Sequence, residues 1–300
     1  FQREPADIAT QGLYFQAMGH FYTQKGDGRA IDVLRRAVSI HWSLGDNRRV
    51  VASLIALGVM FFRQNRHALA EKNYRKAIEI AERCLLQEGL ESAWMNLALI
   101  SIMSNRIAEA LTLFARSRER YQKIGNRAAL ALLESNWAML CLLEKDSQGI
   151  KLHLKRSEQQ SVQNPIILHS FYGVKGLVAL EQGKAVKAQE YLTKSWDILK
   201  EYGLSFKRSE TLSLLGEALL ELKQFEVVNQ CVAELAKQKG TPLYDFWHAL
   251  LLSNWCYQQE KVKLGDSHLL HMIRLVQRSE FPERPDLWLH IQRIRNRFQR

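Results

Sequence analysis

Proline and glycine are scarce in this chain, and their scarcity restricts the fold class. The 300 residues include only 5 prolines and 16 glycines. These are too few to supply the turn that a β-sandwich or barrel needs roughly every 8–12 residues. The chain is nevertheless 47% hydrophobic, which is ample for a buried core and excludes a wholly disordered chain. We therefore predict an all-α protein.

Long apolar runs are also missing. The most conspicuous uncharged apolar stretch, 50–62, is shorter than the roughly 20 residues that cross a bilayer as a helix. We therefore predict no membrane-spanning segment and no membrane partner. The amino terminus does not show the basic region followed by an apolar region that marks a secretory signal. It also lacks an initiator methionine, from which we expect the chain to be part of a longer polypeptide.

Cysteine is rare, and its spacing argues against the common cysteine sites. Cys84, Cys141, Cys231 and Cys256 form no Cys-x-x-Cys pair, so neither a zinc knuckle nor a dithiol redox centre is indicated. Each lies in a helical apolar pattern, where cysteine usually acts as a small buried hydrophobe. A reducing cytoplasm is the simplest location for such a protein.

The residue patterns of catalytic and cofactor sites are likewise absent. No Gly-x-x-x-x-Gly-Lys-Ser/Thr loop occurs, and the glycines at 26–28 lie between two expected helices, not after a strand. His268 and His271 have a spacing that can chelate a metal, but no third ligand is evident. No serine elbow, carboxylate pair or Cys/His set can be placed. We predict that the chain is not an enzyme and binds no cofactor or metal.

The net charge of +11 permits attraction to nucleic acid or to acidic proteins. The basic residues are spread along the chain, with partial clusters at 48–49, 151–156, 207–208 and the extreme carboxyl end. Such a distribution is more typical of solvated helix faces than of a binding stripe. Nucleic acid is therefore a permitted partner but not the favoured one.

A regular repeat organises the chain. Small residues recur in matching apolar contexts at intervals of 38 to 40 residues. They are Gly19, Gly58, Ala98, Ala138, Gly176 and Gly216, with a weaker candidate at Asn254. An interval of this size indicates stacked supersecondary units that bury their apolar faces against one another.

The residues around these small positions identify the unit. Around Gly19, Gly58 and Gly216 a bulky residue lies four before the small residue, an apolar residue just before it and a bulky residue three after it, and Ala98 repeats the first two of these features. A small, bulky, small set then follows 12, 16 and 19 positions downstream. The downstream sets read Ala70, Tyr74 and Ala77; Ala110, Phe114 and Ser117; Ala188, Leu192 and Ser195; and, more weakly, Ile150, Leu154 and Ser157. This pattern resembles the tetratricopeptide repeat (TPR).

The resemblance implies a TPR-like α-solenoid, a right-handed superhelix of about seven antiparallel helix pairs with a further C-terminal helix. The period near 39 exceeds the family's usual ~34. In this longer form the repeats look like the sensor arm of maltose-regulator-type (STAND) bacterial transcription regulators. We expect a single domain over 1–300, with helix pairs near 7–44, 47–88, 91–124, 127–162, 165–202, 205–239 and 243–279 and a terminal helix at 285–299.

The first helices of such a solenoid line its concave wall. Residues six and three before each small residue, and one, four and five after it, should therefore face a groove. In the second to fourth repeats these include apolar residues, namely Ile55, Val59, Phe62, Met95, Leu99, Ile102, Met103, Met139, Leu142 and Leu143. Farther along they include carboxylates, namely Glu181, Glu210, Glu217 and Glu221.

This wall predicts a binding site for a protein or peptide with hydrophobic anchors and a basic end. Such a module would suit the sensor arm of a larger bacterial signalling or transcription regulator. A tighter superhelix would instead pack the same apolar residues on one another. Two other functions stay open, namely RNA binding and a scaffold or homo-oligomer assembled through Trp247, Trp255 and Trp288.

Overall fold

A computed structural model describes residues 5–25, 27–64, 66–160, 164–204, 208–237 and 242–278, together with 287, 290–292 and 294. These residues divide into two compact units. The N-terminal unit comprises Phe1–Ile102 and Arg106–Ile124, and the C-terminal unit comprises Met103–Asn105 and Gly125–Arg300. We describe each unit by itself.

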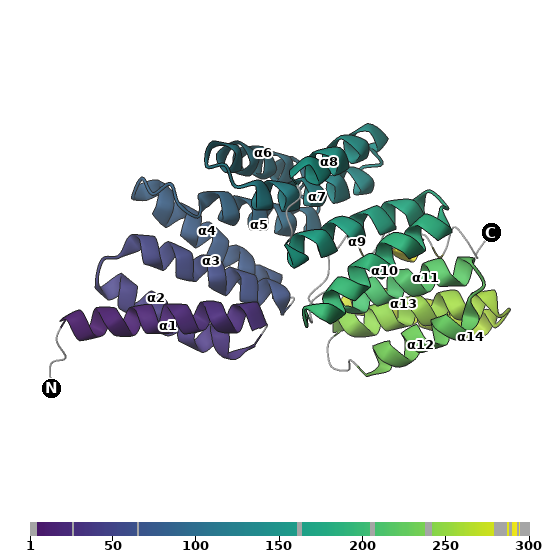
Figure 1. The fold of residues 1–300 in the computed structure, drawn as a ribbon. Helices are drawn as coiled ribbons and strands as arrows, with labels where there is room; N and C mark the ends of the chain where they lie inside the picture. The colour runs from purple at the N-terminus through teal and green to yellow at the C-terminus, as the bar shows by residue number, and fades with distance from the viewer. Residues whose placement is uncertain are drawn as a thin grey trace. The chain divides into compact units, whose positions relative to one another are not determined.

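The all-α prediction is confirmed, since the described residues form helical hairpins in tandem and contain no strand (Figure 1). The N-terminal unit contains α1 (Pro5–Lys25), α2 (Arg29–Ser43), α3 (Asn47–Arg63), α4 (His67–Arg83), α5 (Leu90–Met103) except for its last residue, and α6 (Ile107–Lys123). The C-terminal unit contains α7 (Arg127–Leu143), α8 (Ser147–Gln160), α9 (Pro165–Glu181), α10 (Ala185–Glu201), α11 (Arg208–Glu221), α12 (Phe225–Ala236), α13 (Pro242–Gln258) and α14 (Val262–Arg278).

Consecutive helices pair as the repeat requires. In the N-terminal unit α1 packs on α2, and α3 packs on α1, α2 and α4. In the C-terminal unit the first helices α7, α9, α11 and α13 each contact the next in the series. The expected terminal helix at 285–299 is described only in part. Its helical residues Leu287, Ile291 and Ile294 are buried in the core of the C-terminal unit.

The small residues of the first helices allow the helices of a hairpin to pack closely, as predicted. A Cβ atom added at Gly19 would overlap Leu34, one at Gly58 would overlap the ring of Tyr74, and one at Gly176 would overlap Leu192. Because each of these partners lies on the second helix of the same hairpin, a larger residue would force that pair apart. At Gly216 the overlap is instead with Leu251 of α13, the first helix of the next hairpin.

Three of the small residues on the second helices are serines, and each also forms a hydrogen bond to the first helix of its hairpin. Ser117 donates a hydrogen bond to the carbonyl oxygen of Glu91 at 2.7 Å, and Ser157 donates to that of Ala131 at 2.8 Å. Ser195 donates to that of His169 at 3.2 Å. All three bonds join residues 26 apart and are buried. The serine therefore fastens its helix to the first helix of the same hairpin.

In the third to sixth hairpins, the turn between the two helices places one residue in the left-handed region seven positions after the small residue. The φ angles are +54° at Asn105, +57° at Lys145, +67° at Gly183 and +58° at Lys223. The corresponding turn of the seventh hairpin has Glu260 at +59°, which identifies residue 253 as its small position.

The small residue of the seventh hairpin is therefore Ser253, one residue before the predicted Asn254. Ser253 is fully buried, and its hydroxyl donates to the carbonyl of Gly265 at 3.0 Å. Gly265 stands twelve residues later, where the repeat calls for a small residue. The prediction missed this position because the small residues of the other first helices are glycine or alanine, whereas residue 253 is serine.

Ion pairs connect the second and third hairpins of the N-terminal unit. Arg75 of α4 bonds Glu71 and Glu109, both at 2.7 Å, and Arg106 bonds the same two carboxylates at 2.9 and 2.8 Å. Ser101 also donates to Glu109 at 2.8 Å. Because every charge has two opposite partners, the network fixes the spacing of α4 and α6 more firmly than a single surface pair would.

Candidate functional site

The predicted groove residues of the N-terminal unit lie on α3 and α5. Ile55, Val59, Phe62 and Leu99 are half-buried and present part of their side chains to solvent. Met95 and Ile102 are buried, with 7% and 5% of their surface exposed. The structure therefore leaves four of these six residues accessible.

The remaining predicted groove residues belong to the C-terminal unit. Met103, Met139, Leu143, Glu210 and Glu221 are half-buried, and Glu181 is exposed. Leu142 and Glu217 are buried, with 8% and 2% of their surface exposed. A buried carboxylate such as Glu217 cannot contact a ligand without a rearrangement.

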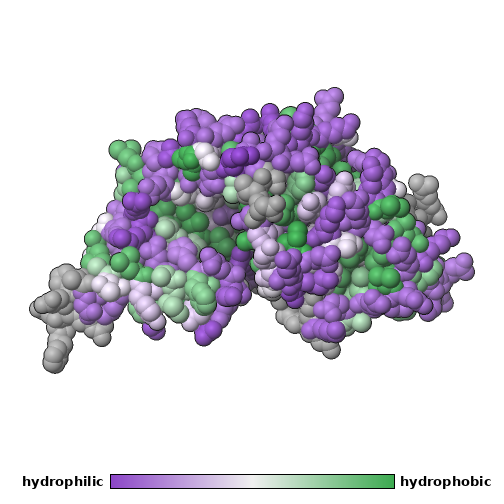
Figure 2. Space-filling view, in the orientation of Figure 1, coloured by the Kyte–Doolittle hydropathy of each residue, from purple (hydrophilic) through white to green (hydrophobic). Residues whose placement is uncertain are grey.

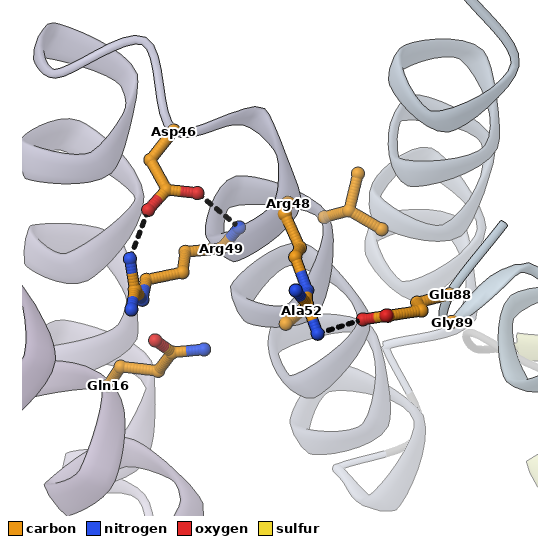
Figure 3. A pocket seen from close by; sticks show the side chains of 8 residues that line it. Gln16, Asp46, Arg48, Arg49, Ala52, Glu88 and Gly89 are labelled. Carbon is orange, nitrogen blue, oxygen red and sulfur yellow. Dashed lines mark hydrogen bonds and ion pairs between the residues drawn. The ribbon is translucent and has the colours of Figure 1, made fainter. Parts of the chain in front are cut away.

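The N-terminal unit contains a pocket on this first-helix face (Figure 3). Its volume is about 710 Å³, within the range of ~300–1,000 Å³ typical of ligand sites. The lining residues come from α1, the α2–α3 turn, the first turns of α3 and the α4–α5 connection. They are Gln16, Asp46, Arg48, Arg49, Val51, Ala52, Glu88 and Gly89.

Two of these residues occupy positions that the repeat assigns to the groove. Gln16 stands three residues before Gly19, and Ala52 stands six before Gly58. Gly89 lies against Ile55, since a Cβ atom added at Gly89 would be 3.1 Å from the Cδ1 atom of Ile55. The pocket is therefore continuous with the predicted apolar wall of α3. Sequence reasoning missed it because Gln16 is polar and Ala52 is small, although the same spacing rule selects both.

Two exposed arginines give the pocket its charge. The side chain of Arg48 bonds Glu88 at 2.5 Å, and that of Arg49 bonds Asp46. In Figure 3 Gln16 lies beside Arg49 and Asp46, while Arg48 reaches Glu88 on the other side. The sequence marks 48–49 only as a basic cluster, because the acidic partners lie in separate connections.

Asp46 has a structural role at this site as N-cap of α3. Its side chain accepts a hydrogen bond from the backbone N–H of Arg49 at 3.1 Å. Burial pushes the pKa of Asp46 up, but the backbone and side-chain hydrogen bonds from Arg49 outweigh burial and leave the pKa below its ordinary value. Asp46 is therefore ionised at neutral pH and holds Arg49 at the pocket edge.

The candidate metal and thiol residues do not assemble into a reactive site. Among the described residues no group of three or more His, Cys, Asp or Glu side chains could hold a metal ion. Cys141, Cys231 and Cys256 are buried and Cys84 is half-buried. Burial raises the pKa of both the Cys141 and the Cys231 thiol to about 11. These thiols are protonated at neutral pH and poor nucleophiles.

Two tryptophans named for self-assembly have distinct environments. Trp247 is 2% exposed and belongs to the core of the C-terminal unit, where it packs edge-on against His290 at 4.9 Å. Trp255 is half-buried, and Trp288 lies outside the described residues. Trp247 is therefore a core residue and offers no surface for another chain.

No helix among the described residues is long and apolar enough to cross a membrane.

Comparison with known proteins supports the repeat assignment. Residues 10–83, which cover most of α1–α4, match the tetratricopeptide repeat. No curated protein shows significant sequence similarity to the chain.

Two solved structures share the fold. The apo form of the quorum sensor NprR from B. thuringiensis has a TM-score of 0.59 and 13% identity, over 94% of this chain and 87% of that one. A Rap protein complexed with Competence and Sporulation Factor has a TM-score of 0.57 and 11% identity, over 99% of both chains. At these identities the likeness concerns the fold alone.

Proposed function

We propose, because residues 10–83 match the tetratricopeptide repeat, that the chain is a non-catalytic module that binds a peptide or an extended protein segment. The observation that carries this proposal is the pocket on the first-helix face of the N-terminal unit. It combines a small apolar floor with exposed arginines, and its size suits a few residues of a peptide.

The chemistry of the pocket favours a ligand with a carboxylate beside a small apolar side chain. Arginine binds a carboxylate through two parallel hydrogen bonds. Half-buried Ala52 offers an apolar surface next to Arg48 and Arg49, with the buried Val51 beside it. The existing ion pair of Arg48 is largely exposed, and that of Arg49 is partly exposed. Such pairs contribute roughly 0–1 kcal/mol each. A ligand carboxylate can therefore replace or share them at little cost.

The wider surface follows from the same repeat positions. Ile55, Val59, Phe62 and Leu99 would hold apolar anchors of a ligand in the N-terminal unit. In the C-terminal unit Met139 and the other accessible groove residues form a separate proposed surface, with Glu181, Glu210 and Glu221 for basic groups. The buried residues Met95, Ile102, Leu142 and Glu217 would support these surfaces from beneath.

As to biological role, we propose the sensor or interaction arm of a larger signalling or transcription regulator. NprR is described as a quorum sensor, and the Rap protein was solved with Competence and Sporulation Factor bound. The fold similarity makes a comparable signal-binding role reasonable for this chain.

The test is selection from a library of random seven-residue peptides, followed by titration of synthetic winners by fluorescence anisotropy. We expect peptides with an acidic residue or a free carboxyl terminus next to Ala, Val or Ser. Arg48→Glu and Arg49→Glu should each weaken binding at least tenfold, since they place a like charge beside the ligand carboxylate. Ala52→Trp should weaken it by filling the pocket.

The matched control is Arg83→Glu, which changes an exposed arginine of α4 outside the pocket. Its affinity should equal that of the unmodified chain, and circular dichroism should confirm that all variants fold. Equal loss with all three arginine substitutions would indicate general electrostatic attraction and refute the pocket. Titration with generic single-stranded RNA at rising salt gives the comparison, because RNA binding must weaken steeply with salt.

A further inference from the structure

Helix α1 exposes a face that the next five hairpins bury. Two first-helix positions define it, five residues before and two residues after the small residue. In the second to sixth hairpins both are at most 8% exposed, whereas in the seventh they are the half-buried His248 and Trp255. The buried pairs are Ser53 and Met60, Ala93 and Ile100, Leu133 and Leu140, Phe171 and Val178, and Thr211 and Ala218. On α1 the same positions carry Tyr14 and Phe21, which are 60% and 51% exposed.

The neighbouring residues show why the two aromatic rings point outward. Arg36 of α2 lies 5.6 Å from the ring centroid of Phe15, and Arg29 lies 4.5 Å from that of Tyr22. These inner aromatic residues immediately follow Tyr14 and Phe21, so α2 covers one side of α1 and leaves the other open. In α3 the equivalent side is the one that packs on the preceding hairpin, because α3 contacts both α1 and α2.

The exposed face is a continuous uncharged stripe. Leu13, Tyr14, Ala17 and Phe21 recur at the three- and four-residue spacing of one helix face, and each is exposed. The helix contains no Asp, Glu, Lys or Arg between Asp7 and Lys25. We call these residues, with Asp7 and Lys25 at the ends, the α1 stripe. In Figure 2 the surface over α1, at the lower left, shows white and pale green residues among purple ones.

We propose that the α1 stripe binds the α1 stripe of a second copy of this chain, in an antiparallel helix pair related by a two-fold axis. The stripe is self-complementary about Ala17. An antiparallel copy centred there places Tyr14 opposite the partner's Phe21, and Asp7 near the partner's Lys25, twice each. Alanine at the centre allows the two helices to approach closely. A two-fold interface requires this kind of self-complementarity.

The size of the stripe sets the strength of the dimer. From Asp7 to Lys25 it is about 27 Å long at 1.5 Å per residue, and a helix face is roughly 10 Å wide. This area is below the ~800 Å² per partner of a standard interface. We therefore expect a reversible dimer with a Kd in the range of about 1–100 μM.

Sedimentation velocity over a concentration series tests the proposal on the full chain. The unmodified chain should shift from monomer to dimer with rising concentration. Tyr14→Glu/Phe21→Glu should raise the Kd at least about 100-fold, because four carboxylates would meet in an apolar interface. The matched control is Tyr202→Glu, another aromatic residue of similar exposure at 55%, which should dimerise normally.

A charge exchange tests the antiparallel register. Asp7→Lys and Lys25→Asp should each weaken the dimer severalfold at low salt, since each sets like charges opposite one another. The double variant should regain the affinity, and so should an equimolar mixture of the two single variants. The effects should decline at high salt because the residues are exposed.

Disulfide trapping tests the centre of the pair, in a Cys84→Ser background. Ala17→Cys should form an intermolecular disulfide readily. Gln24→Cys should not, because its copies would lie about 20 Å apart along the helix axes. Equal trapping of both variants would contradict the antiparallel pair. A monomer at all concentrations, or a dimer that survives Tyr14→Glu/Phe21→Glu, would overturn the proposal.

Discussion

Replacing Gly58 by alanine should destabilise the second hairpin although alanine is the better helix former. A Cβ atom there would lie 2.7 and 2.8 Å from the Cδ1 and Cζ atoms of Tyr74, and closer still to Cε1. Tyr74 is 1% exposed and has no room to retreat. Such overpacking costs about 1–3 kcal/mol, whereas alanine gains about 1 kcal/mol over glycine inside a helix.

The matched control separates these two contributions. Gly173 of α9 is also inside a helix, but a Cβ atom there would meet only the Oγ atom of Ser195, at an ordinary 3.7 Å. Gly173→Ala should therefore stabilise the chain by up to about 1 kcal/mol. The difference between the two substitutions should isolate the overpacking cost of about 1–3 kcal/mol.

A double-mutant cycle then tests whether the Tyr74 ring is the cause. Tyr74→Leu alone removes buried area and destabilises the chain, but in its presence Gly58→Ala should cost less by about 1–2 kcal/mol. The assay is urea unfolding followed by circular dichroism, compared at equal m-values. If Gly58→Ala stabilises the chain as much as Gly173→Ala does, the close contact inside this hairpin does not exist and the repeat assignment loses its physical basis.

Three further predictions concern strain, buried charge and pH. Leu85→Gly should stabilise the chain by about 0.5–1 kcal/mol in urea unfolding. Leu85 is 84% exposed and has a φ angle of +55°, which glycine adopts with less strain than leucine. As a control, Arg83→Gly, inside the last turn of α4, should destabilise the chain. His153→Leu should cost about 3 kcal/mol, since His153 Nδ1 bonds buried Glu134 at 2.6 Å, and adding Glu134→Leu should restore part of that loss. Burial lowers the pKa of His41 despite the opposing charge of Asp46. Because the unfolded chain then binds more protons than the folded chain, the free energy of unfolding should fall as pH drops from 7 to 5. His41→Leu should make this fall smaller.

The small residues could be predicted from sequence because each has a steric reason to be small. Gly19, Gly58 and Gly176 leave no space for a side chain beside Leu34, Tyr74 and Leu192. A constraint of this kind acts on one residue at a time, so it leaves a visible mark at a fixed interval. The helix class and the tandem fold follow from these positions.

Other features depend on residues far apart in the chain, and no local pattern reports them. The pocket requires Gln16, Arg48 and Glu88 to meet from three separate segments. The network of Arg75 and Glu109 joins residues 34 apart. Each of these residues alone looks like an ordinary solvated side chain, so only their assembly distinguishes them.

The same distinction explains why the buried and exposed groove residues could not be separated from sequence. Met95 and Leu99 occupy equivalent positions by the spacing rule, yet Met95 is 7% exposed while Leu99 is half-buried. The rule fixes the direction of a side chain from its own helix, whereas exposure depends on the volume of the neighbouring helices. On α1 no preceding hairpin lies among the described residues, so no neighbouring helix on that side limits the exposure of its side chains. Tyr14 and Phe21 consequently expose the face that the repeat otherwise uses to stack its hairpins, which is why this helix is the place to look for a second copy.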